Sequence, residues 1–253
     1  KTTNEETGVE TLRGQVLFNN EDSYEMVEYF KDKVDRGLMS TRTLSGAYAS
    51  DAMKAGDTTY MYVGSTGGTK YAYDGMADED VFYKDGYRVG VSTVPAFSED
   101  NKAQIQQGPN INLFRKDDEQ QMIASWLFAK YLVSPEVTAE LGVKTGYAPV
   151  RTSAYETDIW TEYVAGIETN PTTMDDAIAK LIKESIELFE NNGDIFFTSA
   201  VFNLSSKTRS EVGSLLVKIL TYQPVGADAA AKAADLRAYI EQQYQESYDF
   251  ITN

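Results

Sequence analysis

The fold is decided by residues 108–156, GPNINLFRKDDEQQMIASWLFAKYLVSPEVTAELGVKTGYAPVRTSAYE. The stretch begins with a run typical of a strand, NINLF at 110–114, and continues to two adjacent acidic residues, Asp117 and Asp118. Because aspartate side chains cap helix N-termini, a helix is predicted to begin there. Apolar residues cover more than one face of that helix: Ile123, Trp126, Leu127, Tyr131 and Leu132. A helix with this pattern is predicted to be well buried.

The same stretch continues into a second helix and a turn. Ser134, Pro135 and Glu136 follow the usual preferences for a helix start, and Gly142 is expected to end the helix. The turn KTGYAPVR at residues 144–151 then brings together a glycine, an aromatic, a proline and an arginine. Glycine permits a reversal of the chain and proline fixes φ, so this turn is predicted to be stiff.

Helix and strand patterns alternate before this stretch. Asn20 precedes an acidic first turn, and the apolar spacing after it predicts a helix that Gly37 stops. The segment TTYMYV at 58–63 predicts a strand that runs into the glycine-rich GSTGG at 64–68. A further strand is predicted for YRVGVSTVP at 87–95.

The chain after residue 156 has an almost wholly helical pattern. Helices are predicted over residues 173–190, 206–220 and 228–250. Strands early in the chain and helices throughout, with connections too long for hairpins, predict an α/β layered fold with a helix-rich C-terminal part.

Composition excludes several classes of function. The 253 residues include no Cys and no His, which rules out a disulfide scaffold, zinc or haem sites with those ligands, and Ser-His-Asp or Cys-His catalysis. The formal charge of -16 with 23 scattered basic residues argues against binding to nucleic acid. No cofactor and no metal site is predicted. No run of apolar residues is long enough to span a membrane.

The glycine-rich loop GSTGGTK is not a nucleotide-binding P-loop. A Walker A motif needs a second glycine where this chain has Thr69. Two interpretations of the loop remain open from its composition. Its backbone N–H groups and the hydroxyls of Ser65 and Thr66 suit hydrogen bonds to a polar ligand, and the same composition also suits a simple surface turn.

Carboxylates supply an alternative from another class of function. A glycoside hydrolase works with two carboxyl groups and needs neither His nor Cys. The chain has 39 Asp and Glu residues, so the presence of a pair does not by itself identify an active site. The acidic segment DGMADED at 74–80 lacks the spaced oxygen ligands of a calcium loop and is predicted to be solvated.

Several of these stretches, taken in order, resemble the extracellular solute-binding proteins of bacterial ABC importers, in the family that includes maltose-binding and other sugar-binding proteins. The resemblance rests on SYEMVEYFKDKVDRGLMS at 23–40, AMKAGDTTYMYVGSTGG at 52–68, RVGVSTVPAF at 88–97 and, above all, residues 108–156 with their Ser-Pro-Glu helix start and Gly-Tyr-x-Pro-Val-Arg turn. It implies a periplasmic-binding-protein-like type II fold, with two layered α/β lobes around a cleft.

The resemblance also implies where a solute binds. The loop at 64–68 falls where the family presents backbone groups to the solute, and the turn at 144–151 falls beside the cleft. A rigid connector without ligand contact is the other interpretation of that turn, in which Arg151 holds the turn rather than the ligand. The expected solute-binding residues are Gly64, Ser65, Thr66, Gly67, Gly68, Tyr71, Gln107, Asn110, Tyr147, Phe202 and Asn203.

The chain departs from the family in length, and it resembles the C-terminal portion of longer members. Residues 1–105 and 157–253 are expected to belong to the second lobe, with 106–156 crossing to the first. The N-terminal half of the family fold, the export signal and the lipid-attachment Cys are expected upstream of this chain. On this interpretation Trp126 and Phe128 lie on an exposed apolar surface unless another fragment or copy covers them.

The expected function is that of a receptor without catalytic activity. A mono- or oligosaccharide is expected to bind between two lobes and to be delivered to a membrane permease, at the surface of a bacterium or in its periplasm. Membrane attachment would require an anchor outside this chain. The alternatives are a carboxylate-based glycoside hydrolase and a receptor fragment that cannot bind ligand because half of its cleft is absent.

Overall fold

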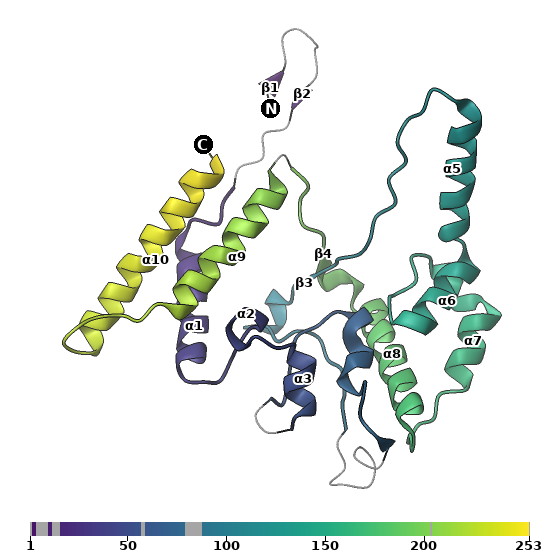
Figure 1. Cartoon of the computed structure of the whole chain (residues 1–253), viewed down its shortest axis with the longest axis horizontal. Helices are drawn as coiled ribbons and strands as arrows, with labels where there is room; N and C mark the ends of the chain where they lie inside the picture. Colours follow the sequence, from purple (N-terminus) through teal and green to yellow (C-terminus); the bar gives the residue numbers. More distant parts are fainter. Residues whose placement is uncertain are drawn as a thin grey trace. The chain divides into compact units, whose positions relative to one another are not determined.

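The computed structural model describes residues 2–3, 10–11, 16–56, 59–78, 88–202 and 204–252. Helices dominate it, and the chain divides into two compact units (Figure 1). Unit 1 contains residues 1–47 and 200–253, and unit 2 contains residues 48–199. The predicted lobe boundaries at residues 105 and 156 follow from the family resemblance and stay a prediction.

Unit 1 is built on three helices, α1 (Glu21–Asp35), α9 (Ser205–Thr221) and α10 (Ala229–Thr252), with the short α2 (Arg42–Ser45) after α1. Both α1 and α10 pack against α9. Each long helix contributes to one apolar core, which consists of Val27, Leu215, Ile219, Ile240 and Tyr244. The predicted cap is confirmed, because the Asn20 side chain accepts a hydrogen bond from the Ser23 N–H at 2.9 Å.

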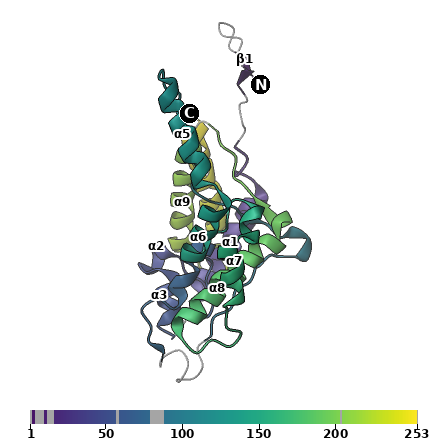
Figure 2. The ribbon, with the colours of Figure 1, turned by 90° about the vertical axis from the view of Figure 1, so that its right-hand side faces the viewer.

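Unit 2 centres on α8 (Met174–Asn191). Around it lie α6 (Pro135–Thr145), α7 (Asp158–Ala165) and the 3₁₀ helix η1 (Thr66–Ala72), and both views place α6, α7 and α8 together (Figures 1 and 2). The shorter elements are α3 (Ala49–Lys54), η2 (Glu99–Asn101), η3 (Thr152–Glu156) and η4 (Gly193–Ile195). The remaining helix, α5 (Glu119–Leu132), directly precedes α6.

The core of unit 2 has two clusters, and α8 contributes to both. On one side, Leu181 and Ala177 pack with Ala72 and Tyr73 from η1 and its end. On the other, Ile182 and Ile186 pack with a set from α6, η3 and α7: Ala139, Ala154 and Trp160. The stripe predicted for this helix therefore lies in the core, where adjacent faces of the one helix hold η1 and the α6–α7 segment.

Strands are few and very short in the part of the chain that is described. β1 (Thr2–Thr3) pairs antiparallel with β2 (Glu10–Thr11), and β3 (Gln104–Ile105) pairs parallel with β4 (Phe196–Phe197). The prediction of strands over 58–63, 87–95 and 110–114 is wrong for their described residues, which form no ladder. Residues of high β propensity form a strand only where a second strand offers its N–H and C=O groups.

Two predictions about helices are corrected. α5 is not well buried, since Ala129 is its one buried residue, whereas Trp126 and Phe128 are exposed, as the family resemblance implied. Gly142 does not end α6, which continues to Thr145 and ends at Gly146 with φ +79°. Gly142 instead lies against the turn, where an added Cβ would come 3.1 Å from the Tyr147 carbonyl oxygen. The helices α2, α3, η1, η2 and η3 were not predicted, whereas α7 and η4 lie in the region after residue 156 that was predicted to be almost wholly helical, without bounds of their own.

Candidate solute-binding site

Two segments that the sequence singled out separately are in close contact in unit 2. The loop GSTGG begins η1, and the turn after α6 carries Gly146 and Tyr147. A Cβ at Gly146 would come 2.8 Å from the Thr66 carbonyl oxygen, closer than real Cβ atoms approach, so only glycine fits there. Gly146 also adopts φ +79°, which glycine accepts without strain. The tight contact and the left-handed turn thus both require this residue.

Side-chain hydrogen bonds hold the other segment, η1, against α8. Thr69 is buried, and its Oγ1 lies 2.7 Å from the Thr66 carbonyl oxygen and 3.3 Å from Ser185 Oγ on α8. Ser185 is also buried, and its hydroxyl donates within α8 to the Leu181 carbonyl oxygen at 2.8 Å. These side chains fix η1 on α8, and they thereby fix the end of the loop that precedes η1.

A pocket of about 410 Å³ lies beside this contact. Its lining residues are Ser65, Gln107, Gly108, Pro109 and Tyr147. Ser65 directly precedes η1, and Tyr147 lies in the turn after α6. The other three, Gln107, Gly108 and Pro109, belong to the segment after β3. The lining offers a hydroxyl, an amide and a phenol ring that is 45% exposed. Such a wall combines hydrogen-bonding groups with one aromatic surface.

The pocket brings together three of the predicted solute-binding residues, Ser65, Gln107 and Tyr147. Gly67 lies directly behind the tyrosine, since a Cβ there would be 2.8 Å from Tyr147 Cε2. Gly64 faces a different ring, because its Cβ would be 3.0 Å from Cε2 of Tyr62. Burial of that Tyr62 ring raises the pKa of its phenol.

Other predicted residues do not line this pocket. Thr66, Gly68, Tyr71 and Asn110 are not among the residues that line it. Phe202 belongs to unit 1, and Asn203 lies outside the described residues. From the sequence, Gly108 was interpreted as a hinge or cleft position but was not counted among the solute-binding residues, and Pro109 was omitted, although a Gly-Pro pair is a common turn signal.

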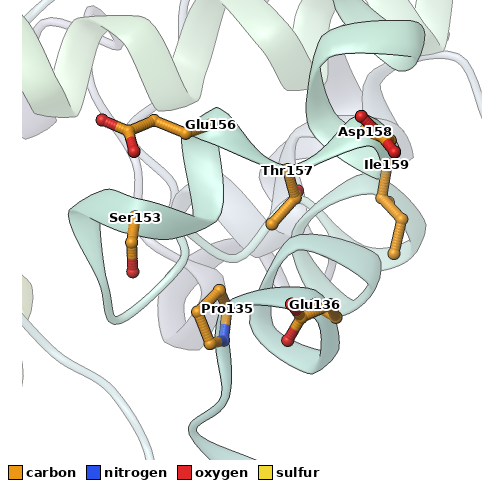
Figure 3. Close-up of a pocket in the computed structure, with 7 residues that line it drawn as sticks. All are labelled: Pro135, Glu136, Ser153, Glu156, Thr157, Asp158 and Ile159. Carbon is orange, nitrogen blue, oxygen red and sulfur yellow. The ribbon is translucent and has the colours of Figure 1, made fainter.

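A second pocket in unit 2, of about 510 Å³, has three carboxylates in its lining (Figure 3). Glu136 comes from the first turn of α6, Glu156 from the end of η3 and Asp158 from the start of α7, with Pro135, Ser153, Thr157 and Ile159 completing the lining. Glu156 and Asp158 extend toward opposite sides in this view (Figure 3). Within the described ranges, no group of acidic side chains is arranged to hold a metal ion.

Comparison with known families identifies the chain. A model of the family described as bacterial extracellular solute-binding protein matches residues 5–169, about two thirds of the sequence. The chain belongs to this family of bacterial extracellular solute-binding proteins, whose members are normally not enzymes. The matched range contains every residue that lines the pocket at Ser65 and Tyr147.

No significant match to the chain is found among curated proteins or among solved structures. Among the described residues, no helix combines the length and the apolar character needed to cross a bilayer. The family description places its members outside the cytoplasm.

Proposed function

We propose that this chain binds a mono- or oligosaccharide in the pocket formed by Ser65, Gln107, Gly108, Pro109 and Tyr147. The observation that carries the proposal is the character of the lining. All five residues are uncharged, and they present one hydroxyl, one amide and one half-exposed phenol ring.

This lining favours a neutral polar solute over an ion. A charged solute loses its hydration when it enters a pocket. This loss of hydration free energy is compensated only by a partner of opposite charge. A sugar instead needs donors and acceptors for its hydroxyls and an apolar surface for its C–H groups. Ser65 and Gln107 supply both donors and acceptors, and Tyr147 supplies the ring.

The first experiment is isothermal titration calorimetry of the 253-residue chain against a panel of neutral mono- and oligosaccharides, with amino acids, phosphate and polyamines as charged competitors. We expect binding to at least one sugar and none to the charged solutes. Tyr147→Ala and Gln107→Ala should each weaken that binding by about tenfold, the equivalent of one well-placed interaction. The matched control is Tyr131→Ala, which removes an exposed tyrosine of α5.

Contrary outcomes separate the alternatives. Tight binding of a charged solute, with no binding of any sugar, would exclude the saccharide. Release of product from a chromogenic glycoside, lost on substitution of Glu136 or Asp158, would instead favour the carboxylate-based hydrolase. Binding without turnover is the result that the receptor predicts.

The same proposal covers the transport role. We place the chain as the receptor of an ABC importer that delivers the bound sugar to a membrane permease from outside the cytoplasm. In this scheme residues 106–156 cross between two lobes, and Tyr71 and Asn110 contact the solute when the lobes close. Reconstitution with the cognate permease in vesicles, scored by sugar uptake, tests delivery.

A further inference from the structure

The contact between Gly67 and Tyr147 has a specific geometry. A Cβ at Gly67 would come 2.8 Å from Cε2, 2.9 Å from Cζ and 3.2 Å from Cδ2 of the tyrosine. These three atoms form one side of the phenol ring, and they account for all three of the nearest heavy atoms. The atoms that a side chain at Gly67 would meet first therefore belong to the ring of Tyr147.

The backbone gives no reason for a glycine here. Gly67 lies inside the 3₁₀ helix η1, and it is not among the glycines with positive φ. At such a position alanine is normally the better residue, because glycine loses more conformational freedom on folding. The demand for glycine at this position comes from the ring, not from the path of the chain.

The tyrosine has a fixed backbone and a movable ring. Gly146, the residue before Tyr147, lies against the Thr66 carbonyl oxygen, and the Tyr147 N–H donates to Thr145 Oγ1 at 3.3 Å. The Tyr147 side chain, in contrast, is 45% exposed. The steric clash of a methyl group added at Gly67 would thus be relieved by rotation of the Tyr147 ring and not by movement of the turn.

We infer that Gly67 is a positioning residue, one that sets the orientation of the Tyr147 ring in the wall of the pocket without itself contacting the solute. This inference rests on the proposed function for its consequence in binding. The glycine leaves room for the ring in its observed orientation, in which it lines the pocket with Ser65 and Gln107. A side chain at this position would turn the ring and change which solutes the pocket accepts.

The neighbouring glycine provides a matched control. Gly68 is in the same 3₁₀ helix and also lacks a positive φ. A Cβ there would meet only Ser65 Oγ, at an ordinary contact distance of 3.5 Å. Gly67→Ala and Gly68→Ala make the same chemical change in adjacent residues, and only the first meets the tyrosine.

The experiment has one readout that needs no ligand. The chain is labelled with 3-fluorotyrosine, and the ¹⁹F resonance of residue 147 is assigned from its absence in Tyr147→Phe. Gly67→Ala is expected to shift this resonance, whereas Gly68→Ala leaves it in place. An unchanged resonance in Gly67→Ala would overturn the inference, whether or not the protein binds sugar.

The second readout is affinity for the sugar that the calorimetric panel identifies, measured as a double-mutant cycle. Gly67→Ala is expected to weaken binding by about tenfold. In the Tyr147→Ala background, Gly67→Ala should cause no additional loss. Equal losses in both backgrounds would overturn the inference, because they would show that the methyl group acts on something other than the ring.

Failure of the proposed function gives a different result. If no sugar in the panel binds the unmodified chain, the saccharide proposal is lost, while the ¹⁹F resonance still decides whether Gly67 sets the ring. If Gly67→Ala shifts the resonance but leaves sugar affinity unchanged, the ring moves without consequence and its role in recognition is excluded. Urea unfolding of both alanine variants shows that each is folded.

Discussion

Two helices of unit 2, α8 and α5, contain many apolar residues and differ in what happens to them. In α8 the apolar residues recur on one stripe, and Leu181, Ile182 and Ile186 are all buried. In α5 the apolar residues surround the helix, yet Ile123 and Trp126 are more than half exposed. The chain thus contains one helix whose pattern matches its surroundings and one whose pattern does not.

The difference lies in the neighbours. α8 has η1 on one side and α6 on another, so its stripe faces packed side chains. α5 packs mainly against α6, and its one buried residue, Ala129, lies in its last turn and a half. Apolar content records what a helix is able to bury, whereas a neighbouring element decides what is buried. The two helices therefore make a matched pair for measuring what packing contributes.

The largest expected difference comes from one substitution made in both helices. Ile186→Ala in α8 removes a fully buried side chain from the cluster around Trp160 and should lower the free energy of unfolding by about 3 kcal/mol. Ile123→Ala in α5 removes a side chain that is 52% exposed and should change it by less than about 0.5 kcal/mol. Urea titration of each variant measures the difference.

Tryptophan fluorescence can follow the urea unfolding of unit 2. The chain has 2 Trp residues, Trp126 on α5 and Trp160 in the core, so a Trp126→Phe background leaves Trp160 as the only indole. A loss for Ile123→Ala as large as that for Ile186→Ala would show that α5 is packed as firmly as α8. That outcome would remove the contrast between the two helices.

The next effect concerns the contact of α7 with α8 and depends on pH. The Tyr163 hydroxyl of α7 donates to the Ala179 carbonyl oxygen of α8 at 2.7 Å, and burial raises its pKa from 10.0 to about 12. Because the folded state holds this proton more tightly than the unfolded state does, stability is fully present below about pH 10 and falls as pH rises toward about 12.

Tyr163→Phe tests this contact at two pH values. At neutral pH the variant should lose about 1 kcal/mol of unfolding free energy with the hydrogen bond. Between about pH 9 and about pH 11 its stability should fall less than that of the unmodified chain, because one phenol no longer contributes to the proton linkage. Tyr131→Phe on the exposed side of α5 should change the neutral-pH value by less than about 0.5 kcal/mol. If the unfolding free energy of Tyr163→Phe falls as steeply with pH as that of the unmodified chain, burial of the Tyr163 phenol does not contribute to the pH dependence.

The starts of several helices were the most predictable part of the fold, because N-caps are local. Asn20, Asp118 and Thr173 each accept a hydrogen bond from the first turn of a helix that begins at the next residue. Strands were the least predictable part. Residues 110–114 have the composition of a strand, yet the described structure gives them no strand to pair with. Pairing is a property of two segments, and no single segment reveals it.

The candidate site was predictable in its parts but not in its assembly. The sequence singled out Ser65, Gln107 and Tyr147 in three separate stretches, and the pocket brings them together. Ser65 and Tyr147 lie close together because Gly146 contacts the Thr66 carbonyl oxygen, and these residues are far apart in the sequence. Phe202 was predicted from the resemblance as well, and it stays a prediction because it belongs to the other unit.

The smallest expected effect comes from two serines that make the same local bond. Ser185 of α8 donates to the carbonyl oxygen four residues earlier at 2.8 Å, and Ser125 of α5 does the same at 2.8 Å. Ser185 is buried and its Oγ also lies 3.3 Å from Thr69 Oγ1 of η1, whereas Ser125 is exposed and, within the described residues, its hydroxyl bonds inside its own helix.

Substitution of each serine by alanine isolates the contact with η1. The acceptor carbonyls keep their helical hydrogen bonds in both variants, so Ser185→Ala should cost only about 0.5 kcal/mol, and Ser125→Ala should be neutral or slightly stabilising because alanine favours helix. Hydrogen exchange at the η1 amides adds a local readout, since faster exchange is expected in Ser185→Ala alone. Equal protection of η1 in both variants would mean that Thr69 holds η1 without Ser185, and that the base of the pocket depends on the apolar contact of Ala72 and Tyr73 with α8.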